Sequence, residues 1–148
     1  MSKLFSIMFL MTAFSSIAAE KVSFVSLLSS PDKYDGKCVQ TVGVISVEFE
    51  NGSLYLDQAS YIARAYENAI SQPFEAAQVT YNSDNPEAHI QKLAGAYEGK
   101  FVRVVGKFKA FNPSRRLNRA KSYFSSISHI QTLAPNEGSS FGNQARCF

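Results

Sequence analysis

Nine residues between positions 103 and 123 could together hold an anion. Seven are basic and two are aromatic: Arg103, Lys107, Lys109, Phe111, Arg115, Arg116, Arg119, Lys121 and Tyr123. Arginine binds phosphate or carboxylate groups through paired hydrogen bonds, and lysine adds positive charge. Aromatic rings among such cations can stack on the rings of a ligand. We therefore predict an anion-binding surface in this part of the chain, with Phe111 and Tyr123 as its stacking residues.

Charge is divided unevenly along the chain. Residues 20–98 hold five basic and eleven acidic side chains, a net charge of −6, whereas residues 99–148 hold nine basic and one acidic, a net charge of +8. A block of cations is typical of a surface that meets an acidic partner. The alternative is that these cations are solvated and only balance the acidic part of the same molecule.

Carboxylates offer a second kind of chemistry. Glu48, Glu50 and Asp57 flank an expected hairpin and could bind a divalent cation or transfer protons. Acids beside an Asn-Gly turn are also typical of a solvated hairpin tip. A metal-assisted hydrolase of phosphate esters would need acidic ligands beside its arginines, and residues 99–136 contain no acid. We expect no enzymatic activity and no cofactor, and keep such a hydrolase as a third hypothesis.

Histidines and cysteines point to structure rather than catalysis. His89 and His129 fall on an expected helix and an expected strand, without the spacing of metal ligands, so we predict no metal site. Cys38 and Cys147 lie far apart in the sequence, and in an oxidising compartment such a pair favours a disulfide. Two free thiols are the alternative. A disulfide also explains both residues better than a catalytic thiolate does.

The first nineteen residues resemble an export signal. Lys3 is followed by a mostly apolar run and by the small residues Ala18 and Ala19, which suit a cleavage site. A membrane anchor is the alternative, but the run is short and interrupted by serine and threonine. We predict a signal peptide over residues 1–19, a domain over 20–134 and an irregular tail over 135–148. The protein would then be periplasmic or secreted, with no stable membrane span after cleavage.

The elements that position these residues are marked by a repeat. Residues 34–43 (YDGKCVQTVG) return as residues 97–106 (YEGKFVRVVG), each a turn followed by an alternating Val-rich run that includes a glycine. The first run predicts a long strand over 39–47, and Asn51-Gly52 predicts a hairpin returning through residues 53–56. The second run predicts a strand over 101–109 with Arg103, Lys107 and Lys109 on its outward face.

The remaining pattern completes a small barrel. Residues 22–28 favour a short N-terminal helix, a third strand is expected between residues 69 and 81, and Pro86 begins a helix that Gly99 ends. Residues 123–132 alternate as a fifth strand. The sequence therefore predicts a mainly β protein: a five-stranded OB-fold-like barrel with one helix between strands three and four.

The repeated motif also resembles a known group of proteins. The two Tyr-x-Gly-Lys-x-Val-x-x-Val-Gly runs, with residues 127–133 as a closing strand, resemble those of small exported OB-fold-like bacterial proteins whose activity is largely uncharacterised. The resemblance covers residues 22–133 and implies the fold but no catalytic residue. Residues 57–80 are expanded relative to that pattern, and the Arg-rich loop after Phe111 lies outside it.

These observations favour an exported binding module. The loop between strands four and five of an OB barrel is a recurrent ligand-binding edge, and we expect its cations to bind an anionic component of the cell envelope. The alternative is an inhibitor or assembly factor whose loop docks on an acidic protein surface. Nucleic acid is disfavoured as a partner, because an exported chain more often meets envelope polymers, lipid headgroups and proteins.

Overall fold

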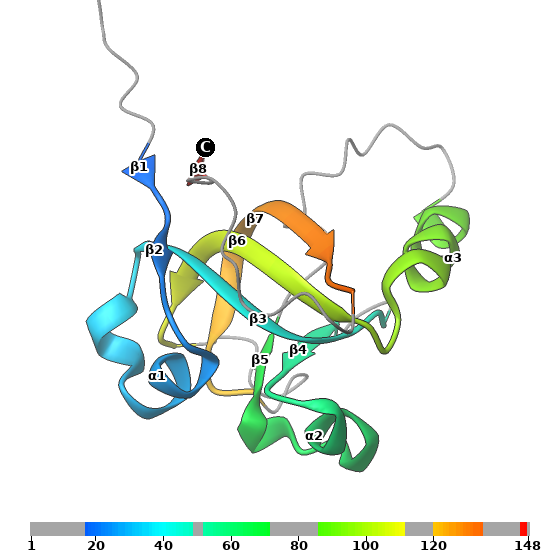
Figure 1. Cartoon of the computed structure of the whole chain (residues 1–148), viewed down its shortest axis with the longest axis horizontal. Coiled ribbons are helices and arrows are strands. Elements are labelled where there is room, and N and C mark those ends of the chain that lie inside the picture. The colour runs from blue at the N-terminus through cyan, green and yellow to red at the C-terminus, as the bar shows by residue number, and fades with distance from the viewer. Residues whose placement is uncertain (1–16, 49–51, 72–85, 112–119, 135–145, 148) are drawn as a thin grey trace, which may run out of the picture.

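A computed structural model of the chain is drawn in Figure 1, and it describes residues 17–48, 52–71, 86–111, 120–134 and 146–147. Its centre is a closed barrel of five strands: β3 (Cys38–Ser46), β4 (Ser53–Tyr55), β5 (Ala69–Ser71), β6 (Phe101–Lys109) and β7 (Tyr123–Thr132). Their spatial order is β3-β4-β5-β7-β6, and β6 pairs back with β3 to close the barrel. Only β5 and β7 pair in parallel within this ring. This strand order and the one parallel pair are those of an OB fold, so the predicted fold class is confirmed.

Short elements surround the barrel: β1 (Ile17–Ala18), β2 (Glu20–Lys21), α1 (Phe24–Ser29), η1 (Pro31–Tyr34), α2 (Gln58–Ala63), η2 (Tyr66–Asn68), α3 (Pro86–Tyr97) and β8 (Arg146–Cys147). The predicted N-terminal helix is α1. In chain order α3 comes between β5 and β6, the third and fourth barrel strands, as expected (Figure 1). β2 runs parallel to β3, and β1 pairs with β8.

The barrel interior is filled by the side chains on one face of each strand. Ile45, Leu54, Ile70, Phe108 and Phe124 are fully buried there, and the rings of Phe108 and Phe124 meet edge to face with centroids 6.1 Å apart. From outside, α1 closes part of this core through Phe24 and Leu27. Burial of such side chains is the main source of stability, at about 1.5–3 kcal/mol for each one fully buried.

The two copies of the repeat pair with each other. β3 and β6 are antiparallel, and Thr41 lies opposite Val104, the residue at the same position in the other copy. Matching hydrogen bonds flank this centre: the N–H of Gly36 donates to the carbonyl of Phe108 over 2.8 Å, and the N–H of Gly99 donates to that of Ile45 over 2.9 Å. The repeat is therefore a local two-fold symmetry of the backbone.

The acidic residue of each repeated turn has the same role. Asp35 Oδ1 accepts the backbone N–H of Ala110 over 3.0 Å, and Glu98 Oε2 accepts the backbone N–H of Val47. Val47 and Ala110 occupy equivalent positions, each directly after its strand. Each carboxylate thus satisfies the N–H that follows the partner strand, which the sequence pattern alone did not explain.

Strand β7 departs from the predicted alternation. Phe124 and Ile127 both point into the core, and Ile130 packs against it, although residues three apart lie on opposite faces of a regular strand. Two register shifts against β6 account for this, since they leave Ser125 and Ser128 without a Cα partner. The Ser125 and Ser128 hydroxyls donate to the carbonyls of Lys107 and Val105, each over 3.2 Å.

Candidate functional site

Three of the seven predicted cations, Lys107, Lys109 and Lys121, lie at one end of the barrel, where β6 ends and β7 begins. Lys107 and Lys109 lie on the outer side of β6, and Tyr123 sits directly opposite Lys109. Phe111 follows β6 and is 71% exposed, and Lys121 precedes β7 and is also exposed. Arg115, Arg116 and Arg119 lie outside the described residues.

Residues 34–37, the turn of the first repeat copy, lie next to Lys109; we call them the first repeated turn. The ammonium of Lys109 is 3.6 Å from Asp35 Oδ2, in a pair in which both side chains are exposed, and it lies 3.8 Å from the position a Cβ would take at Gly36. An exposed pair of this kind contributes about 0–1 kcal/mol. Together with the bond from Ala110 to Asp35, it fixes the start of the β6–β7 loop beside the turn.

Two further lysines meet at this turn, and the sequence reasoning did not include them. Lys33 Nζ lies 5.4 Å and Lys37 Nζ 5.6 Å from the centroid of the Tyr34 ring, which is itself buried. The sequence signal that could have pointed to them is the presence of two lysines four residues apart on either side of Tyr34. We call Lys33, Lys37, Lys107, Lys109 and Lys121 the basic end.

Arg103 differs from the other predicted ligands. It lies on the outer side of β6, as expected, but only 8% of it is exposed, and its Nη1 donates to Gln131 Oε1 over 3.1 Å. Strand β8 contacts β6 and β7. The expectation that all three cations of β6 form one exposed face is therefore corrected, because Arg103 is buried and bonded to β7.

The predicted disulfide between Cys38 and Cys147 is confirmed. Their Cα atoms lie 5.8 Å apart with the sulfur atoms bonded, which is a usual separation for a bridge. Cys38 is opposite Lys107 at the start of β3. The bridge therefore ties β8, close to the C-terminus, to the basic end.

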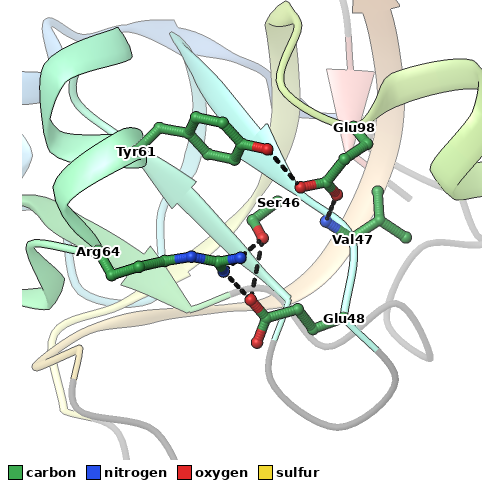
Figure 2. A network of polar contacts seen from close by, with 6 residues as sticks. All are labelled: Ser46, Val47, Glu48, Tyr61, Arg64 and Glu98. Atoms are coloured by element: carbon green, nitrogen blue, oxygen red, sulfur yellow. Dashed lines mark hydrogen bonds and ion pairs between the residues drawn. The ribbon is translucent and has the colours of Figure 1, made fainter.

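A network of polar contacts occupies the opposite end of the β3–β6 pair (Figure 2). Arg64, directly after α2, forms an ion pair with Glu48, and its Nη1 also donates to the Ser46 hydroxyl over 3.3 Å. The Tyr61 hydroxyl donates to Glu98 over 2.7 Å, which raises the pKa of Tyr61. This network ties α2 to β3 and to the turn before β6.

The carboxylates that were weighed against a solvated hairpin tip have structural roles where the structure describes them. Glu48 pairs with Arg64, and Asp57 begins α2 by accepting the N–H of Ser60 over 2.7 Å, which lowers the pKa of Asp57. Glu50 lies outside the described residues. Within the described ranges no three His, Cys, Asp or Glu side chains come close enough to hold a metal ion. His129 is exposed on β7, and His89 falls within α3.

A tyrosine cluster covers the outer side of β4. Tyr55 is 1% exposed, and its ring centroid lies 6.0 Å from that of Tyr61 and 6.2 Å from that of Tyr66. Burial, followed by the neighbouring Tyr66, raises the pKa of Tyr55 to about 12. Ala120, at the end of the β6–β7 loop, belongs to the same cluster and is fully buried. Ala110, bonded to Asp35, and Ala120, buried in this cluster, are thus held against the barrel on the two sides of residues 111–119.

Comparison with other proteins adds little to this geometry. No family model and no curated protein matches the chain, and no helix in the described ranges is long and apolar enough to cross a membrane. A chain of the Stn1-Ten1 complex of S. pombe is 13% identical, with 82% of this chain and 83% of that chain covered and a TM-score of 0.44. A protein described as an aspartyl-tRNA synthetase from Leishmania major is 14% identical, with 81% of this chain but 22% of that chain covered and a TM-score of 0.44. The OB fold is assigned here from the strand order and not from these similarities.

Proposed function

We propose that the protein is an exported, non-enzymatic binding module whose basic end holds an anionic component of the cell envelope. One observation carries the proposal: Lys107, Lys121 and the ring of Phe111 are all exposed around the end of β6 and the start of β7, and neither lysine forms an ion pair with any described residue. Available cations together with an exposed aromatic ring suit a ligand that carries negative charge and a stackable ring or sugar.

The rest of the molecule supports this choice of surface. At the opposite end, Arg64 is paired with Glu48, and Glu98 is engaged by Tyr61 and Val47. Among these three charged groups two are acidic and one is basic, so together they do not attract an anion. Arg115, Arg116 and Arg119 belong to the same loop in the sequence and would add to the positive charge of the basic end.

The test is retention of envelope material by the immobilised protein. Wild type, the double variant Lys107→Ser/Lys121→Ser and a triple variant with Arg115, Arg116 and Arg119 changed to Ser are compared. A matched control, Lys92→Ser/Lys100→Ser, also removes two positive charges, but from exposed lysines outside the basic end. We expect wild type and the control to retain anionic material from a protein-free envelope fraction, and the double and triple variants to release it at lower salt.

Two outcomes would contradict the proposal. Equal retention by all four proteins would show that the basic end is a solvated surface. Retention that disappears when the envelope fraction is treated with protease would assign the surface to an acidic protein partner instead.

A further inference from the structure

We infer that the ligand surface extends from Lys107, Lys109 and Lys121 onto Lys33 and Lys37, which flank Tyr34 at the turn of the first repeat copy, and that the ligand is a linear polyanion. This inference rests on the proposed function and specifies its ligand class. A linear polyanion is a flexible chain that carries a phosphate or carboxylate group on each repeating unit.

The buried ring of Tyr34 holds Lys33 and Lys37 in place. This ring is 6% exposed and belongs to the core, and the ammonium groups of Lys33 and Lys37 lie 5.4 and 5.6 Å from its centroid. Both lysines are exposed, although their side chains approach the buried ring. The ring therefore holds two flexible side chains near fixed positions, which reduces the entropy lost when they bind an anion.

The first repeated turn and η1 lie against the end of β6. Helix η1, which contains Lys33, contacts β6, and Lys109 pairs with Asp35 and lies over Gly36. Lys107 is directly opposite Cys38, the residue after Lys37. The turn and the loop stem therefore form one surface.

The arrangement of the cations selects the ligand class. The five lysines of the basic end sit on separate segments, which are η1, the turn, β6 and the residues just before β7. A chain of repeated charges can contact cations on separate segments in succession, so this arrangement favours a polymer over a single small anion. Two of the five have acidic partners, Lys37 with Glu20 at 3.5 Å and Lys109 with Asp35 at 3.6 Å, and Asp32 is a third nearby acid. Exposed pairs such as these exchange readily for a stronger anion.

Binding of long-chain polyphosphate, measured by titration over a series of salt concentrations, tests the inference. For Lys33→Ser/Lys37→Ser we expect affinity to fall about tenfold. The slope of log affinity against log salt should fall by about 1.4, at about 0.7 for each contact to a flexible chain. The control is again Lys92→Ser/Lys100→Ser, because Lys100 is the repeat equivalent of Lys37 and is also exposed. Orthophosphate should bind wild type far more weakly than the polymer.

A second variant guards against loss of binding through misfolding. Glu20→Gln removes the acid that pairs with Lys37, so in the wild-type background it should raise polyphosphate affinity about threefold. Added to Lys33→Ser/Lys37→Ser, where Lys37 is already absent, it should leave the tenfold loss of affinity largely in place. An unchanged salt slope in Lys33→Ser/Lys37→Ser, with Lys107→Ser/Lys121→Ser still defective, would overturn the extension but leave the proposed function standing. Binding to anionic lipid vesicles without binding to polyphosphate would overturn the ligand class.

Discussion

Gly106→Ala tests the close approach of β6 and β7. A Cβ at this position would lie 2.4 Å from the carbonyl oxygen of Ser126, 3.0 Å from Phe124 Cδ1 and 3.3 Å from Ile127 Cα. Two of these three atoms belong to the backbone, so the neighbours cannot simply rotate away. Overpacking of this kind costs about 1–3 kcal/mol, and alanine restricts the unfolded chain by about 0.4–1 kcal/mol in the opposite direction. Because the nearest atom is a backbone oxygen at 2.4 Å, the cost should lie at the upper end of that range, for a net loss of about 2 kcal/mol.

Urea unfolding followed by far-ultraviolet circular dichroism measures this loss directly, as a lower midpoint at an unchanged slope. Melting temperature should fall by about 4–8 °C. The control is Gly95→Ala, since nothing lies within 4 Å of a Cβ at this helical position; it should gain about 0.5–1 kcal/mol. If Gly106→Ala were as stable as wild type, the reasoning about the β6–β7 contact would be refuted.

Three further predictions concern the disulfide, the buried tyrosine and the repeated acid. Replacing Cys147 with Ser opens a loop that spans 109 positions and should cost up to about 4–5 kcal/mol in the same urea assay, whereas a loss below about 1 kcal/mol would contradict a structural bridge. Because the pKa of Tyr55 is raised from 10.0 to about 12, its contribution to stability is fully present below pH 10 and should decline as the pH rises toward 12, by at most about 2.7 kcal/mol; Tyr55→Phe should make the decline smaller, leaving the part due to the raised pKa of Tyr61, and an undiminished decline would exclude Tyr55 as a cause. Glu98→Ala removes the acceptor of Val47 and Tyr61 and should cost about 1–3 kcal/mol, with a lower Tyr61 pKa in an ultraviolet titration; an unchanged Tyr61 pKa would contradict the hydrogen bond.

Much of the fold was predictable because its signals are local. The Val-rich runs, the Asn-Gly sequence between the antiparallel strands β3 and β4, and the glycines that end or bend elements each act through the residues beside them. Gly99, for example, has a φ of 68° two residues after the last residue of the helix it was expected to end. The pairing of Cys38 with Cys147 followed from there being only two cysteines.

What the sequence could not predict depends on contacts between distant segments. Strict alternation failed in β7 because Ser125 and Ser128 are accommodated by bonds to β6, and no local rule marks them as bulges. Arg103 alternates correctly onto the outer side of β6, but its burial depends on partners remote in the chain. Lys33 and Lys37 likewise join the basic end only because η1 contacts β6.

The two-fold pairing of β3 and β6 has a consequence for how the molecule approaches a partner. Symmetry is held by backbone bonds about Thr41 and Val104, so side chains at the two ends are able to differ. One end presents the lysines of the basic end, and at the other end Glu48 and Glu98 outnumber Arg64. A charge separation along paired strands gives the barrel an electric moment. In the field of an anionic polymer such a molecule rotates before contact, so that collisions occur with the lysines leading and the association rate falls as salt is added.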